Sequence, residues 1–249
     1  MTTVLSGIGR YAIWCLHFGR AVWVHGPPKG QTLNEAFRIG IKSLPILLII
    51  SAFVGTNLAL QGYNAFKPLG GQRLVGMFVA LAGVRELAPI IAAAMIAAKA
   101  GTEMASQIGV MKIREQLDAF NVMAVNPLAY LVAPRMIGIM LMLPALTVIA
   151  IFVMLVAAYS VCVFQLGLAG HEFIHFASDA IEPIDFLYGA VKAMLFGLII
   201  CTISCYNGFH CGKGPEGVGA ATNRAVVTSS VICIVINYFV SEMLYGGVL

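Results

Sequence analysis

Five long apolar segments, separated by polar stretches, dominate the hydropathy pattern of the chain. A helix needs about 20 predominantly apolar residues to cross the hydrocarbon core of a bilayer, and each segment is close to that length or longer. The pattern therefore predicts five transmembrane helices. They cover residues 43–60, 74–98, 133–164, 186–206 and 225–245.

The second of these segments is interrupted by charge and by a proline. Arg85 and Glu86 stand inside the apolar run, and Pro89 follows them. Because proline removes a helical hydrogen bond and kinks a helix, two arrangements are open. The segment is either one kinked helix or a short interfacial piece followed by a helix over about residues 87–108. Both alternatives give one crossing of the membrane.

Residues 1–40 form a region of their own, in which short apolar patches alternate with basic residues. The stretch RYAIWCLHFGRAVWVHG is too short and too charged to cross a bilayer. Trp14, Trp23 and the flanking arginines suit a helix that lies in the headgroup layer. We therefore expect an N-terminal interfacial helix in residues 1–40 and a transmembrane domain over residues 41–249. A loose N-terminal tail is the alternative.

Composition excludes a soluble domain. Hydrophobic residues make up 60% of the 249 residues and charged residues 10%, with a mean hydropathy of +0.91. A soluble domain carries about 25% charged residues, which it needs to cover its surface. The fold class is therefore all-α integral membrane, and the net charge of +4 is no indication of nucleic-acid binding.

The basic residues predict the orientation of the helices. With the N-terminus in the cytoplasm, eleven of the 15 lysines and arginines lie in cytoplasmic segments, as the positive-inside rule requires. Five crossings then place the C-terminus outside, and the acidic loop over residues 167–185 faces outward. The eleven are Arg10, Arg20, Lys29, Arg38, Lys42, Lys99, Lys112, Arg114, Arg135, Lys213 and Arg224.

A short amphipathic helix is predicted between the second and third spans, over about residues 113–122. Leu117 and Phe120 lie on one face of it with Ile113, and Glu115 and Asp118 lie on the other. This segment is on the predicted cytoplasmic side. A charged amphipathic helix between two spans can lie flat and meet a soluble partner, whereas a plain connecting helix is the simpler interpretation.

The stretch GHEFIHF contains His171-Glu172-x-x-His175, which on a helix is typical of a zinc protease. Zinc catalysis also needs a third ligand and room for water and peptide, and only Asp179 and Glu182 lie nearby. The alternative is an outward-facing surface helix without catalytic zinc, and this is our prediction. Its packed residues would be Phe173, Ile174 and Ala177.

Four strings occur in order along the chain and resemble one known family. They are KSLPILLIISAFVGTNLALQG, VRELAPII, AKAGTEMASQIGVMKIREQLDAFNVMAVNPLAYLVAPR and GVGAATNRAVVTSS. Together they look like the MlaE/YrbE family of permeases, from the ABC transporters that move lipids with MCE-domain proteins. The resemblance runs from about Leu33 to the C-terminus.

The resemblance implies a homodimer in the bacterial inner membrane, bound to two cytoplasmic ATPase subunits and to a periplasmic MCE-domain ring that exchanges phospholipid. The chain itself lacks G-x-x-x-x-G-K-[ST], so ATP must be hydrolysed by another subunit, and we expect no catalytic residue, metal or cofactor here. A secondary transporter or ion channel would also be hydrophobic. The resemblance implies that the amphipathic segment is the ATPase-coupling helix, with candidates Lys112, Arg114, Glu115, Gln116 and Asp118.

Lys99 and Glu103 are the candidates for the lipid path. They stand one helical turn apart at the end of an apolar run, where an ionisable pair is costly unless it pairs or meets a polar ligand. The resembling family often has arginine at the place of Lys99. The alternative is that Lys99 extends to the cytoplasmic interface and Glu103 neutralises it.

Small residues recur every four positions through this same segment. On a helix they form one groove, which lets another helix approach closely. Tight packing is the predicted role of Ala93, Ala97, Gly101, Ala105 and Gly109.

Overall fold

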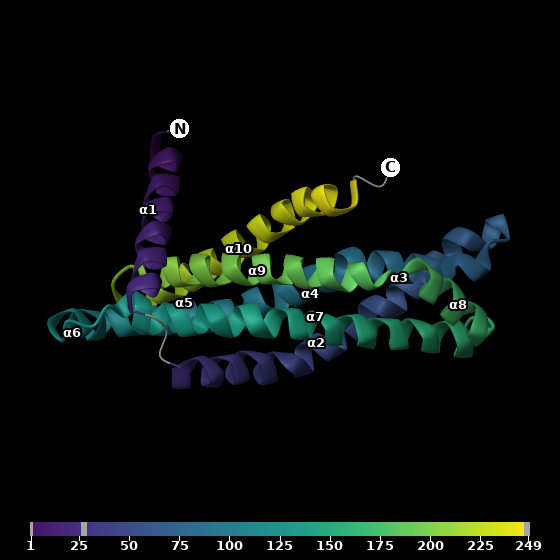
Figure 1. Ribbon diagram of the computed structural model, residues 1–249, viewed down its shortest axis with the longest axis horizontal. Coiled ribbons are helices and arrows are strands. Elements are labelled where there is room, and N and C mark those ends of the chain that lie inside the picture. The colour runs from purple at the N-terminus through teal and green to yellow at the C-terminus, as the bar shows by residue number, and fades with distance from the viewer. Residues whose placement is uncertain (1, 26–28, 247–249) are drawn as a thin grey trace. The chain divides into compact units, whose positions relative to one another are not determined.

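The computed structural model describes residues 2–25 and 29–246, and side chains over residues 9–21 and 30–246. Within these ranges the secondary structure is helical and contains no strand (Figure 1). Five helical runs are long and apolar enough to cross a membrane. The predicted five spans and the all-α membrane fold are therefore confirmed.

Four of the spans are single helices. These are α2 (Lys29–Phe66), α7 (Ala133–Phe164), α9 (Pro183–Phe209) and α10 (Gly214–Tyr245). The start of α7 and the ends of α7 and α10 fall where the hydropathy pattern places them. By contrast, α2 begins well before the predicted span, so the expected boundary at residue 40 lies within a continuous helix.

The remaining span is one helical run with two π-helical turns. It comprises α3 (Val75–Ala82), η3 (Gly83–Leu87), α4 (Ala88–Ile96), η4 (Ala97–Gly101) and α5 (Thr102–Ile113). Pro89 follows directly on the first π turn, where the regular hydrogen-bond ladder is already interrupted. The run is therefore one modified helix and not two separate pieces.

The chain divides into two compact units, each assembled from three separate stretches. Unit 1 contains Met1–Ile39, Ile96–Met142 and Gly197–Ile232. Unit 2 contains Gly40–Met95, Leu143–Phe196 and Cys233–Leu249. The divisions fall inside the spanning helices, so each span contributes to both units.

In unit 1, aromatic side chains hold the N-terminal helix α1 (Thr2–His25) against α9. Tyr11 donates a hydrogen bond of 2.7 Å to Thr202, and the rings of Trp14 and Tyr206 meet edge to face at 5.7 Å. α1 is not among the runs apolar enough to cross a membrane, in agreement with an interfacial helix. The side chain of Trp23, which the prediction also used, lies outside the described residues.

The small residues pack as predicted. All five positions of the stripe are buried. A Cβ atom on Gly101 would lie 2.9 Å from Ser204 Oγ, and one on Gly109 would lie 3.2 Å from Val218, both within unit 1. The stripe therefore allows close helix–helix contact.

The predicted amphipathic helix over residues 113–122 is divided in two. α5 ends at Ile113, Glu115 has a left-handed backbone (φ 59°), and α6 covers Gln116–Val122. Leu117 is buried and the Phe120 ring packs on Tyr130 at 5.4 Å, as the apolar face requires. Ile113 does not join that face because the break turns it outward.

In unit 2, the HEFIH segment forms a helix, α8 (Gly170–Ala180), packed on α3. A Cβ atom on Gly76 would lie 2.5 Å from the carbonyl oxygen of Phe173, so the contact needs a glycine. Phe173 and Ala177 are buried, as predicted. Ile174 is 57% exposed, so its predicted packing was wrong.

Candidate functional site

A buried lysine lies at the centre of a polar cluster in unit 2. Lys192 of α9 has no exposed side-chain surface. Its Nζ donates to the backbone oxygen of Arg85 at 2.8 Å, to Glu86 Oε1 at 3.1 Å and to Ser241 Oγ at 2.8 Å. An ammonium group has three donors, and here each of them has an acceptor.

Glu86 receives further donors from α10. Its Oε2 accepts hydrogen bonds from Asn237 Nδ2 at 2.7 Å and from Ser241 Oγ at 3.0 Å. Glu86 lies in the π turn η3, and π turns change the direction of side chains at functional sites. The turn therefore brings the carboxylate to both α9 and α10.

A second ion pair adjoins this one. Arg85 Nε lies 3.0 Å from Asp185 Oδ1, and the carboxylate also accepts from the backbone N–H of Glu182 at 3.0 Å. Asp185, at the end of the acidic loop over residues 167–185, is buried. We call the whole set the Lys192 network: Arg85, Glu86, Asp185, Lys192, Asn237 and Ser241.

Three members of the Lys192 network, Glu86, Asn237 and Ser241, line a pocket of about 560 Å³, the Glu86 pocket. Glu86 keeps 37% of its side chain exposed, and a second carboxylate, Glu242, also lines the pocket. The pocket thus combines polar and acidic groups with apolar walls. The walls include Ile90, Ile234, Tyr238 and Tyr245.

Unit 1 contains a second charged cluster, the Arg135 network, formed by Glu35, Arg38, Glu103, Gln107 and Arg135. Arg135 is buried and donates to Gln107 Oε1 at 2.9 Å, with Glu35 3.9 Å away. Arg38 contacts Glu35 at 3.0 Å and Glu103 at 3.4 Å. This network connects the first turns of α2 with α5 and α7.

The structure places the two lipid-path candidates differently. Lys99 is exposed and lies in the π turn η4. Glu103 contacts Arg38 and also accepts a hydrogen bond of 3.3 Å from Gln107 Nε2. Glu103 is thus part of the Arg135 network, which sequence reasoning did not anticipate.

The coupling candidates lie on the surface of unit 1. Arg114, Glu115, Gln116 and Asp118 are exposed at the start of α6. Lys112 is exposed as well, but its Nζ donates to the backbone oxygen of Cys211 at 3.0 Å. Four of the five candidates therefore remain available to a partner along one short segment.

In α8 the zinc-protease pattern has other contacts. Glu172 is paired with Arg73 at 3.2 Å, and His175 Nδ1 lies 2.7 Å from Asp179. In the part of the chain that the structure describes, no group of three or more His, Cys, Asp or Glu side chains could hold a metal ion. The residue that would act as base is instead part of a surface ion pair.

Sequence reasoning missed Glu86 and Lys192 as functional candidates. A signal existed, because both interrupt apolar spans, and ionisable residues inside spans commonly mark substrate or ion pathways. The partners of Lys192 are 49 and 106 positions away along the chain, so only the fold reveals them.

Spanning helices that enclose ionisable side chains beside a pocket are typical of multi-pass membrane proteins of the transporter class. The sequence model of the family described as permease MlaE matches residues 32–243. The chain belongs to this family of permeases, and the resemblance seen in its motifs is confirmed. The family does not favour the zinc protease or the secondary transporter.

Several curated relatives cover most of the chain. A probable ABC transporter permease protein of Rickettsia prowazekii is 36% identical over a match that includes 86% of this chain and 82% of the relative. For a probable ABC transporter permease protein of Synechocystis, the identity is 34% over 87% of this chain and 82% of the relative. The intermembrane phospholipid transport system permease protein MlaE of Haemophilus influenzae is 31% identical, with 84% and 80% covered.

Proposed function

We propose that the chain is the membrane-spanning permease subunit of an ABC transporter that moves phospholipid between the bacterial inner membrane and a periplasmic MCE-domain protein. It acts as a homodimer, and a separate cytoplasmic ATPase subunit supplies the energy. Membership of the permease family and the name of the Haemophilus relative support this proposal.

The Glu86 pocket is the observation that carries the proposal within this chain. A phospholipid needs apolar walls for its acyl chains and polar groups for its head. The pocket provides both, because its lining combines the polar side chains of Asn237, Ser241 and two glutamates with aliphatic and aromatic side chains. Its volume lies in the range of small-molecule sites, about 300–1,000 Å³.

Filling the pocket tests this function. Ile234→Trp places a large ring on the lining, whereas Val235→Trp adds the same ring at the next position of α10, which does not line the pocket; both residues are exposed. We expect the first variant to lose most ATP-dependent transfer of labelled phospholipid in reconstituted vesicles, and the second to keep it. Equal transfer by both variants contradicts the assignment.

The proposed orientation places the N-terminus and α6 in the cytoplasm and α8 and the C-terminus outside. The distribution of basic residues supports it. Ser178 of α8 is exposed, so Ser178→Cys is suited to an impermeant thiol reagent. We expect labelling when the reagent has access only to the non-cytoplasmic face of the membrane. Labelling only from the cytoplasmic face contradicts the orientation.

The proposed ATPase contact is the start of α6. Glu115 and Asp118 are exposed and lie one turn apart, which suits basic groups on a partner. Reversing both charges to lysine should uncouple ATP hydrolysis from lipid transfer or dissociate the complex. Asp179→Lys on α8 is the control, since it changes an exposed acid outside the proposed contact. Normal assembly and transfer by the double variant contradict the proposal.

A further inference from the structure

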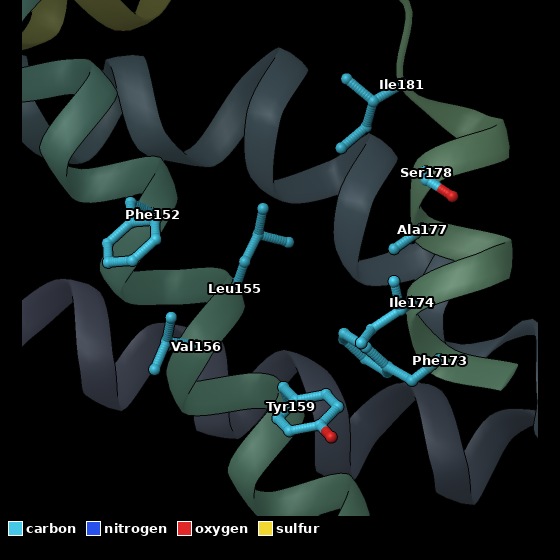
Figure 2. Close-up of a pocket in the computed structure, with 9 residues that line it drawn as sticks. All are labelled: Phe152, Leu155, Val156, Tyr159, Phe173, Ile174, Ala177, Ser178 and Ile181. Carbon is cyan, nitrogen blue, oxygen red and sulfur yellow. The ribbon is translucent and has the colours of Figure 1, made fainter. Parts of the chain in front are cut away.

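A second, wholly apolar cavity lies between α7 and α8 in unit 2. Figure 2 shows side chains of the two helices facing one another across it, with Leu155 from α7 opposite Phe173 and Ile174 from α8. The cavity has a volume of about 340 Å³, and we call it the α7–α8 groove. One of its walls is formed by the Tyr159 ring, which packs edge to face on Phe173 at 5.8 Å.

The α7–α8 groove offers almost no hydrogen-bonding group to a ligand. The two polar atoms of its lining are the hydroxyls of Tyr159 and Ser178. Ser178 Oγ already donates to the backbone oxygen of His175 at 2.9 Å. A polar headgroup would lose its hydrogen bonds to water in this groove without forming new ones. A hydrocarbon chain has no hydrogen bond to lose by entering it.

The groove continues the apolar surface of a spanning helix. Phe152 and Val156 line it and are 68% and 48% exposed, and Val148 extends the same exposed stripe one turn earlier on α7. Because α7 crosses the membrane, these side chains meet lipid and not water. α8 also carries Glu172, which pairs with Arg73 of the short helix η2 (Gln72–Leu74), as expected of an amphipathic helix at a membrane surface.

We propose that the α7–α8 groove binds one acyl chain of a bilayer phospholipid, and that it is distinct from the Glu86 pocket. The occupant is identified by three features of the groove: a carbon lining, continuity with the lipid-facing stripe of α7, and amphipathic α8 at its edge. The inference concerns binding alone, so it can be tested whether or not the protein transports phospholipid.

The test uses trace phospholipid with a photoactivatable group near the end of one acyl chain, added to the full chain purified with its ATPase subunit in detergent. Mass spectrometry then maps the modified residues. We expect labelling over residues 152–159 and 173–181 above that of the exposed stripe at Val148. Ser178→Phe should lower groove labelling about four- to fifteenfold, which corresponds to excluding one or two methylenes.

Val148→Phe is the matched control, since it adds the same ring to the same lipid-facing surface outside the groove. It should leave groove labelling unchanged. Ala177→Phe fills the groove from a second position and should reproduce the loss. The proposal would be overturned if groove labelling were no stronger than that at Val148, or if neither Ser178→Phe nor Ala177→Phe lowered it. The label would then come from the lipid that surrounds any membrane protein. Labelling that disappears when a membrane-anchored partner is co-purified would overturn it in favour of a protein occupant.

Discussion

The Lys192 network and the Arg135 network each join two cations to two anions, yet they differ in how completely the most buried cation of each is hydrogen-bonded. Lys192 is fully buried and uses all three of its donors. Arg135 is almost as buried, but its contact with Glu35 is 3.9 Å long and its Nη1 has no hydrogen-bond partner among the described residues. Buried charge is costly unless every donor and acceptor is paired.

The difference concerns how firmly each of these two cations is held. All three donors of Lys192 are paired, which fixes its ammonium group beside Glu86. Arg135 has an unpaired nitrogen, and the side chains of Arg38 and Glu103 in its network remain partly exposed. We therefore expect the contacts of Arg135 to break more easily than those of Lys192.

The largest expected effect comes from breaking the Lys192 network. Lys192→Met removes the cation and leaves the Glu86 carboxylate without its ion-pair partner, which should lower the free energy of unfolding by about 3–5 kcal/mol. Replacing both residues, as Lys192→Met with Glu86→Gln, should restore much of this loss because no unpaired charge remains. Denaturation in mixed micelles measures both variants. Val191→Met on the same helix is the control and should stay close to the parent.

Arg135→Met should have a smaller effect. It removes one good hydrogen bond to Gln107 and one long ion pair, so the expected loss of unfolding free energy is about 1–3 kcal/mol. Glu35 keeps Arg38 as a partner at 3.0 Å. A loss as large as that of Lys192→Met would show that the two networks are equally rigid, and the comparison above would be wrong.

Lys99→Ala should hardly change stability, by about 0.5 kcal/mol or less, since the residue is exposed. If Lys99 borders the lipid path, the variant should lower phospholipid transfer while assembly with the ATPase stays intact, and Lys99→Arg should keep most of the activity. Transfer at the parental rate by Lys99→Ala supports the alternative, in which the side chain only extends to the membrane surface.

The smallest effect is expected at α8. Glu172→Gln breaks a pair whose arginine is largely exposed, and such surface pairs contribute about 0–1 kcal/mol. Phospholipid transfer should be unchanged, because no catalysis depends on this carboxylate. Metal analysis of protein purified without added zinc provides the check: stoichiometric zinc that disappears on His175→Ala would contradict our interpretation of HEFIH.

The spans could be predicted because each spanning helix needs a long apolar segment of its own, whatever its neighbours are. The same local reasoning found the buried small residues that recur over residues 93–109, since their spacing belongs to one helical run. It also found Leu117 and Phe120 on the packed face of the amphipathic segment.

Two features could not be predicted in this way. The pairing of Glu86 with Lys192 depends on three helices meeting, which no single segment encodes. The break before α6 depends on Glu115 adopting a left-handed backbone, a conformation usually taken by glycine and occasionally by asparagine or aspartate. Tertiary context thus overrode the local signal at both places.

The backbone around α6 has one further consequence. Glu115 precedes this helix and Ala124 follows it, and both are non-glycine residues with positive φ, 59° and 57°. Each such residue costs about 1–3 kcal/mol and persists only where its surroundings fix it. We therefore expect the short helix to be preorganised for the proposed ATPase contact, with little conformational entropy left to lose on association. A segment held in this way would pass on a displacement of its partner, whereas a flexible loop would absorb it.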